Sequence, residues 1–151
     1  MENNNRLRWL QYRIIHRILP TNHWLYKIGI INNPNCTKCN KNVVETLNHL
    51  FLECNVVEKF WSSFISQWDF IFHDISDDEK LFGIIDEKSE NWELKNHLLL
   101  IAKRYIYIDR CKGSTLSVRV FNVLLKDTAR LEEIIARQKG KLVFHYKKWS
   151  G

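Results

Sequence analysis

Apolar side chains recur every three or four residues along most of the chain, which is the period of an amphipathic α-helix. The clearest example lies between residues 93 and 108, where apolar positions alternate at spacings of four and three. The same period predicts helices over residues 6–19, 21–29, 42–53, 60–68, 93–108 and 116–138. A loop at residues 30–44 and a turn at residues 109–115 are expected to connect them.

Several polar residues and two helix breakers indicate where these helices begin and end. Pro20 ends the first helix, because its ring cannot occupy a helix interior. Thr21 or Asn22 can cap the second, and Gly29 suits its C-terminus. The segment 42–45, Asn-Val-Val-Glu, has the form of a capping box, in which a polar acceptor is followed three residues later by glutamate. It predicts the start of the third helix.

The composition favours helices over sheets. Glycine and proline contribute only seven of the 151 residues, whereas sandwiches and barrels need tight turns at short intervals. We therefore predict an all-α fold with little or no sheet. Residues 69–92 are acidic and irregular, with an apolar island at 81–85 that suits a strand or a helix turn. We expect this segment to be a hinge or loop between residues 1–68 and a C-terminal helical hairpin with a basic tail, residues 93–151.

Four residues show the spacing of a zinc site, C-x2-C-x9-H-x4-C. They are Cys36, Cys39, His49 and Cys54. Thiolates and imidazole are the ligands that Zn²⁺ prefers in a tetrahedral site, and four protein ligands leave no position open for water. The spacing therefore predicts a structural CCHC zinc knuckle inserted between helices, with no catalytic role.

Chance spacing of separately buried cysteines is the alternative explanation of this motif. Glu45 lies one helical turn before His49, where it suits an acceptor that orients the imidazole ring, although its capping role competes for the same carboxylate. Cys111 has no cysteine or histidine beside it and is predicted to be a buried apolar thiol.

The net charge of +6 is unevenly distributed. Residues 1–60 carry eight basic and four acidic side chains, residues 61–93 carry two and nine, and residues 94–151 carry thirteen and four. A polyanion would therefore be met by the two basic ends. A solvated surface of uneven sign explains the same numbers without any ligand.

Three basic clusters are candidates for contact with nucleic acid. They are Arg6, Arg13 and Arg17 on the first helix, Lys38 and Lys41 at the rim of the knuckle, and Arg119, Lys126, Arg130 and Arg137 on one stripe of the last helix. Pairing with Glu133 would neutralise part of the last cluster.

Aromatic residues divide into two groups by their surroundings. Tyr146 and Trp149 in the basic tail suit base stacking. Four other tryptophans lie at helical spacing with apolar residues and are predicted to belong to the core, namely Trp9, Trp24, Trp61 and Trp68.

The motif and its surroundings resemble a known family. The residues that carry the resemblance are Arg17-Ile18-Leu19-Pro20-Thr21-Asn22, Leu25, Gly29-Ile30, Cys36, Cys39, Glu45-Thr46, His49-Leu50-Phe51, Cys54 and Trp61. Together they resemble the zinc-binding region that follows the reverse transcriptase domain in non-LTR (LINE-type) retrotransposon polyproteins. The tail resembles the end of such polyproteins more weakly, at Tyr107, Arg110-Cys111 and Lys147-Lys148-Trp149.

The resemblance implies that Cys36, Cys39, His49 and Cys54 are the metal ligands. It also implies a role in holding RNA and DNA near a polymerase, with a reverse transcriptase domain as a partner, and that the chain corresponds to the C-terminal piece of such an element. Asp77-Asp78 follows no apolar strand, so a polymerase palm is not expected.

These observations lead to two functional hypotheses. The first is a non-catalytic zinc module that binds RNA or single-stranded DNA non-specifically, and the alternative is a structural zinc module for protein docking. The sequence shows no nucleophile–base arrangement and no Gly-rich phosphate loop, so neither an enzyme nor a small-molecule substrate is expected. No apolar run approaches the ~20 residues of a membrane span, and the polar start of the sequence lacks the apolar core of a secretory signal. A reducing compartment inside the cell, nuclear or cytoplasmic, is therefore expected, where cysteines are thiols or metal ligands.

Overall fold

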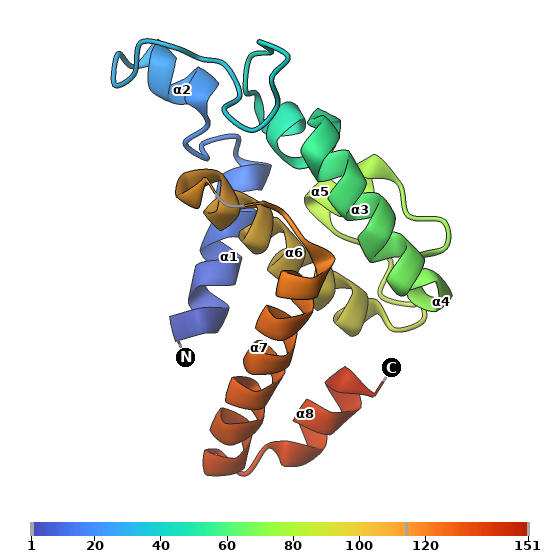
Figure 1. Ribbon diagram of the computed structural model, residues 1–151. Helices are drawn as coiled ribbons and strands as arrows, with labels where there is room; N and C mark the ends of the chain where they lie inside the picture. Colours follow the sequence, from blue (N-terminus) through green and yellow to red (C-terminus); the bar gives the residue numbers. More distant parts are fainter. Residues whose placement is uncertain (1, 114, 151) are drawn as a thin grey trace.

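The fold is 67% helical, and the part of the chain that the structure describes contains no strand, which confirms the predicted all-α class. This computed structural model describes residues 2–113 and 115–150, with side chains from residue 5 onward. The elements in chain order are α1 (Glu2–Ile15), α2 (Asn22–Lys27), the π-helical turn η1 (His49–Glu53), α3 (Asn55–Gln67), α4 (Asp69–Phe72), α5 (Asp77–Phe82), α6 (Trp92–Lys112), α7 (Val118–Gln138) and α8 (Leu142–Trp149) (Figure 1).

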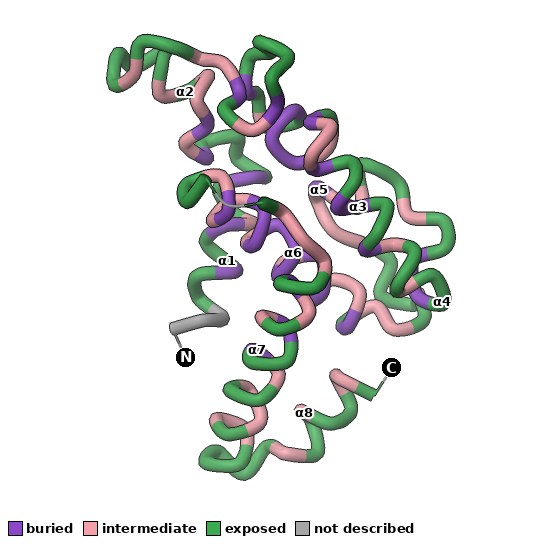
Figure 2. The backbone as a smooth tube through the Cα atoms, in the orientation of Figure 1, coloured by how far each residue is buried: buried purple, intermediate pink, exposed green. Residues whose placement is uncertain are grey.

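Helix α6 lies at the centre of the fold and contacts α1, η1, α7 and α8 (Figure 1). The predicted apolar positions Leu94, Leu98, Ile101 and Tyr105 are all buried, and Ile108 is half-buried. The period of this segment therefore predicted both the helix and the face that packs. Figure 2 shows buried backbone concentrated along α6, η1 and the inner sides of α1 and α3.

An aromatic cluster joins α3, α6 and the beginning of α7. The ring of Phe121 lies 5.7 Å from Phe60, 5.5 Å from Phe64 and 5.8 Å from Tyr105, measured between centroids. Aromatic pairs at such separations contribute about 0.5–1.5 kcal/mol each beyond their buried area. This cluster fixes the N-terminal half of α7 against the core.

The first helix is shorter at its end than the apolar period suggested. Helix α1 ends at Ile15, and Arg17 adopts a left-handed conformation with φ 55°. The amide of Ile18 donates to the carbonyl of Arg13 at 2.9 Å, which closes the last turn before Pro20 is reached. The prediction of a helix to residue 19 was wrong. Leu19 fits the apolar period because it is buried, but it lies in an irregular segment after the helix.

The predicted capping box at residues 42–45 does not form. Asn42 is left-handed with φ 51°, Val44 makes an antiparallel bridge with Asn35, and the amide of Glu45 donates to the carbonyl of Pro34 at 2.9 Å. The segment is therefore one side of a small hairpin-like loop. The carboxylate of Glu45 is fully buried and serves a tertiary contact, so it is not available to cap a helix.

The acidic segment 69–92 is more regular than predicted, since it contains α4 and α5. A capping box forms here: the Glu79 amide donates to Ser76 Oγ at 3.2 Å, and the Ser76 amide donates to Glu79 Oε2 at 2.8 Å. Leu81 is buried, and α5 contacts α1 and η1. Of the two structures considered for the island 81–85, the helix turn is correct for its first two residues, and Gly83 ends that helix with φ 91°.

The predicted turn at 109–115 begins later than expected. Helix α6 continues through Lys112, and Gly113 caps it with φ 64°. The extra turn matters because it carries Asp109 and Arg110 towards the segment that holds the cysteines.

Helix α7 follows the predicted range, but its apolar stripe is largely exposed. Phe121, Leu125 and Thr128 are buried, whereas four of the predicted apolar positions are exposed, namely Val120, Val123, Leu131 and Ile134. The C-terminal half of α7 extends beyond the core and is flanked by α8, which the sequence analysis did not predict (Figures 1 and 2).

A polar contact holds α8 in place. Glu132 of α7 accepts hydrogen bonds from Lys148 Nζ at 2.7 Å and Trp149 Nε1 at 3.2 Å, and its Oε1 lies 3.0 Å from Nε2 of the buried His97 of α6. Trp149 therefore packs inward, and Tyr146 is the more exposed of the two residues that were predicted to stack on bases.

None of the helices in the described part of the chain combines the length and the hydropathy needed to cross a lipid bilayer.

Candidate metal centre

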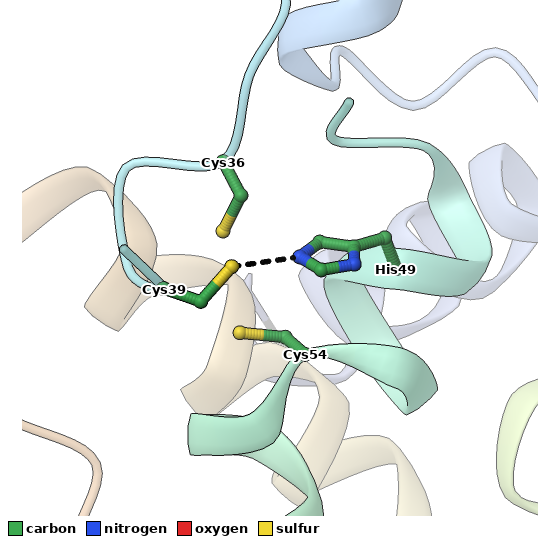
Figure 3. A group of neighbouring side chains, drawn as sticks. All are labelled: Cys36, Cys39, His49 and Cys54. Carbon is green, nitrogen blue, oxygen red and sulfur yellow. Dashed lines mark hydrogen bonds between the residues drawn. The ribbon is translucent and has the colours of Figure 1, made fainter. Parts of the chain in front are cut away.

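Cys36, Cys39, His49 and Cys54 converge on a common centre (Figure 3). One ligand atom from each residue lies within 4.8 Å of the other three, and Cys39 Sγ is 3.3 Å from His49 Nε2. In a tetrahedral zinc site, Zn–S bonds of about 2.3 Å place sulfur atoms about 3.8 Å apart. Small side-chain adjustments therefore suffice to close the four atoms around one ion.

The first two ligands come from the loop between the two bridged segments. Cys36 directly follows the bridging residue Asn35, and its amide donates to the carbonyl of Val43 at 2.8 Å. The amide of Lys38 points at Cys36 Sγ at 3.4 Å. The loop thus folds back on itself and supplies an N–H group to one sulfur, an outer contact of the kind that stabilises a thiolate ligand.

The other two ligands are brought together by the π-helical turn. In an α-helix, residues five apart point about 140° away from each other around the axis. In η1 the amide of Cys54 instead donates to the carbonyl of His49 at 3.0 Å, so the turn closes over five residues. Both side chains then face the same centre (Figure 3). A π turn at this point is the local feature that makes the H-x4-C spacing work.

The chemistry of the donor set suits zinc. All four ligand side chains are buried, and three thiols with one imidazole form a soft donor set. In the metal-free chain, burial raises the pKa of the Cys36 thiol to about 11. A bound divalent cation reverses that preference, because coordinating thiols are deprotonated. The pocket is therefore an unfavourable place for free thiolates and a suitable one for a neutralising cation.

The last turn of α6 supports the centre through Arg110. Its Nε donates to Oε1 of the buried Glu45 at 2.7 Å, and its two terminal nitrogens donate to the carbonyl of Pro20 at 3.0 Å and to Asn22 Oδ1 at 2.8 Å. Glu45 Oε1 also accepts from the amide of Asn22 at 2.8 Å. Burial raises the pKa of Glu45, and the Asn22 amide and the Arg110 charge oppose that shift. The carboxylate thus serves Arg110 and Asn22 directly, and does not make the predicted hydrogen bond to His49.

The residue before Arg110 makes a second contact with the cysteine loop. Asp109 forms an ion pair with Lys38, and the Asp109 side chain is 1% exposed. Lys38 was predicted to face nucleic acid, but its charge is engaged by this buried carboxylate. Asp109 and Arg110 therefore contact this part of the chain at two points, Lys38 and Glu45.

Comparison with known proteins agrees with this geometry. Residues 2–61 match the model of the family described as zinc-binding in reverse transcriptase. This segment is a reverse transcriptase zinc-binding domain. The family recognised from the sequence is thereby confirmed, and all four candidate ligands lie inside the matched segment. No curated protein and no solved structure matches the chain significantly.

The zinc-binding domain is completed by residues from outside the matched segment. Asp109 and Arg110 lie far along the chain, and no pattern in the sequence predicted a role for them at the metal centre. The one signal available was the weak resemblance of the tail, which included Arg110. Helical periodicity gave no such signal, because both residues are polar and were placed in a turn.

Apart from Lys38, the residues of the predicted basic clusters are exposed. Arg6 and Arg13 are exposed on α1 of the zinc-binding domain, and Arg17 is exposed just beyond the end of that helix. Lys41 is exposed in the cysteine loop. The structure places all four basic residues of the α7 stripe at the surface, namely Arg119, Lys126, Arg130 and Arg137.

Glu133 neutralises part of the α7 stripe, as the sequence suggested. Arg137 donates to Glu133 Oε1 at 3.0 Å, and the same oxygen accepts from Tyr146 at 2.9 Å. The phenol of Tyr146 is therefore tied to α7, although the residue is half exposed.

Two predictions about burial were wrong. Trp9 is 60% exposed and Trp24 is 36% exposed, whereas Trp61 is buried and donates from Nε1 to the carbonyl of Phe51 at 2.7 Å. Cys111 is exposed, because it lies on the outer side of the last turn of α6. Trp9 matches the helical period of α1, but the side of that helix that packs carries Leu7, Leu10 and Ile14, which are buried.

Proposed function

We propose that the chain is a non-catalytic zinc-binding module that holds RNA or single-stranded DNA, with a reverse transcriptase domain as its protein partner. The observation that carries the proposal is the closed Cys3His set. Four buried protein ligands complete a tetrahedron and leave no coordination position for water or substrate, as in structural zinc sites. The ion then supplies folding free energy to the loop and to η1, and no chemistry of its own.

Exposed basic residues support the nucleic-acid part of the proposal. Arg6 and Arg13 on α1 and the basic stripe of α7 lie at the surface, while the acidic residues concentrate between residues 61 and 93. Phosphates attract such clusters without sequence preference, and the affinity follows the number of counterions released. The matched family is described by its occurrence in reverse transcriptase, whose work brings nucleic acid close to this module. Free cysteine ligands suit the reducing compartments inside a cell.

The test combines metal analysis with filter binding. Purified chain should contain about one zinc, and its affinity for a single-stranded oligonucleotide should fall with salt by a slope of roughly 0.7 per phosphate contact in a log–log plot. Absence of binding at low salt, even near the ~10⁻⁴ M end of the non-specific range, would contradict the nucleic-acid part.

Exposed apolar residues favour the second candidate function, protein docking without nucleic acid. Val123, Ile134 and Phe144 on α7 and α8 are at least half exposed, which is unusual for a free surface. Co-elution with a reverse transcriptase domain of the same family, together with no oligonucleotide binding, would favour this function.

A further inference from the structure

Helices α1 and α6 enclose a groove whose chemistry differs from the rest of the surface. Its volume is about 450 Å³, and its lining includes Arg6, Trp9 and Arg13 of α1 and Arg104 and Tyr107 of α6. Leu10, Leu19 and Ile108 form the remaining lining. The described residues that line this groove include three arginines and no carboxylate.

Positive charge is concentrated in this groove by the packing of the two helices. Burial lowers the pKa of Arg104, and the charge of Arg6 acts in the same direction. Burial raises the pKa of the Tyr107 phenol, and the nearby charges of Arg110 and Arg13 oppose that shift. Like charges brought together by a fold favour an anionic ligand that spans them.

Trp9 gives the groove a second property. Its indole is 60% exposed at the edge of the groove, and Tyr12 contacts it edge-on with ring centroids 5.6 Å apart. A large exposed ring beside arginines is the combination that binds single strands, because phosphates pair with guanidinium groups while an unstacked base lies on the ring. An acidic peptide would use the arginines but would gain little from the indole.

We propose that the groove between α1 and α6 binds one segment of a single-stranded polynucleotide, with a base stacked on Trp9 and phosphates held by Arg6 and Arg13. This site rests on the proposed function and makes it more specific, because it assigns strand binding to the groove and not to the basic stripe of α7. The stripe offers exposed charges on one helix, whereas the groove combines two walls, charge and an aromatic platform.

Residues of α6 connect the groove to the segment around the metal centre. Tyr107 lies in the groove wall, its hydroxyl donates to the carbonyl of Pro20, and the guanidinium of Arg110 sits 5.5 Å from its ring centroid. Arg110 in turn binds Glu45 beside the cysteine loop. Arg110 therefore contacts both a residue of the groove wall, Tyr107, and a residue beside the cysteine loop, Glu45.

The experiment compares matched variants of the zinc-loaded full chain by filter binding to a 12-nucleotide single strand and to an abasic strand of equal length. Trp9→Leu should weaken binding to the normal strand about tenfold or more, leave the salt slope unchanged, and leave the abasic strand unaffected, because stacking needs a base. Arg13→Gln should lower the salt slope by roughly 0.7 on both strands. Trp24→Leu and Lys59→Gln remove an equally large ring and one exposed positive charge outside the groove, and should bind like the parent chain.

Photo-crosslinking to a thiouridine-containing strand, followed by peptide mapping, provides a readout that does not depend on variants. Cross-links on the α1 peptide that contains Trp9 support the site. If the parent chain binds but the Trp9 and Arg13 variants bind equally well, and cross-links map to α7 or α8, the groove assignment is overturned while the proposed function stands. If polyglutamate competes as strongly as the oligonucleotide, the groove is a general anion site and the assignment is likewise overturned. If the parent chain binds no nucleic acid, both proposals fail.

Discussion

Arg110 donates to Glu45 from a helix that lies outside the matched zinc-binding segment, and the two side chains are 9% and 0% exposed. Removing one partner of such a pair leaves a buried charge without compensation. We expect Arg110→Leu to lower the free energy of unfolding by about 3–5 kcal/mol and to weaken zinc retention. Urea unfolding and a competition assay with a chromophoric chelator measure the two effects.

A double variant and a neighbouring charge provide controls for this prediction. Glu45→Leu combined with Arg110→Leu should recover part of the lost stability, because no buried carboxylate is then left alone. Lys112→Gln changes an exposed cation two residues further on and should leave the unfolding midpoint unchanged. A loss in Arg110→Leu no larger than in Lys112→Gln would show that the pair does not support the centre.

The cysteines offer a matched pair for testing the metal site. Cys54→Ala removes one of the four converging ligands, so we expect loss of most of the zinc and a chain that is less stable. Cys111→Ser removes the exposed cysteine, which lies outside the cluster, and should retain about one zinc per chain. Elemental analysis measures the zinc content of both variants. Full retention of zinc by Cys54→Ala would refute the ligand assignment.

The sequence predicted those features that depend on local spacing. The period of residues 93–108 gave α6 and most of its buried face, and C-x2-C-x9-H-x4-C gave the four residues that converge. It failed where tertiary contacts decide a residue's role. Glu45 matched a capping box but is buried in a contact with Arg110, and Trp9 matched a core position but lies at the edge of a groove and is 60% exposed.

The support of the centre by α6 could not be predicted, because no periodicity links Asp109 to Lys38 or Arg110 to Glu45. The π turn could not be predicted from the sequence either. Its single defining bond, from the Cys54 amide to the His49 carbonyl, differs from an α-helical bond by one residue and leaves no mark in composition.

Lys103 predicts an unusual dependence of stability on pH. Its Nζ is buried and donates to Gln11 Oε1 and to the carbonyl of Leu81 at 2.8 Å, joining α6 to α1 and α5. Burial lowers the pKa of this amine from 10.5 to about 7. Between these values the unfolded chain binds more protons, so the free energy of unfolding should rise with pH, by at most about 1.4 kcal/mol per pH unit.

Urea unfolding of the zinc-loaded chain at pH 7, 8 and 9 measures this rise. Lys103→Met should remove it, while Lys112→Gln, an exposed lysine of the same helix, should retain it. Equal slopes in the parent chain and in Lys103→Met would contradict the assignment to Lys103.

Glu132 predicts the opposite dependence at acid pH. Burial alone would raise its pKa, but the contacts and charges of His97 and Lys148 outweigh burial and lower it from 4.5 to about 2. The folded carboxylate therefore contributes stability that is complete above about pH 4.5 and is lost as the pH falls towards 2. Because the side chain is partly solvated, we expect the loss to be on the order of 1–2 kcal/mol.

Glu132→Gln should show less acid sensitivity and looser attachment of α8, whereas Asp127→Asn, an exposed carboxylate of the same helix, should behave like the parent chain. Guanidinium unfolding between pH 3 and 6, with hydrogen exchange of the α8 amides, measures both effects, and equal acid sensitivity in all three proteins would assign the dependence to other groups.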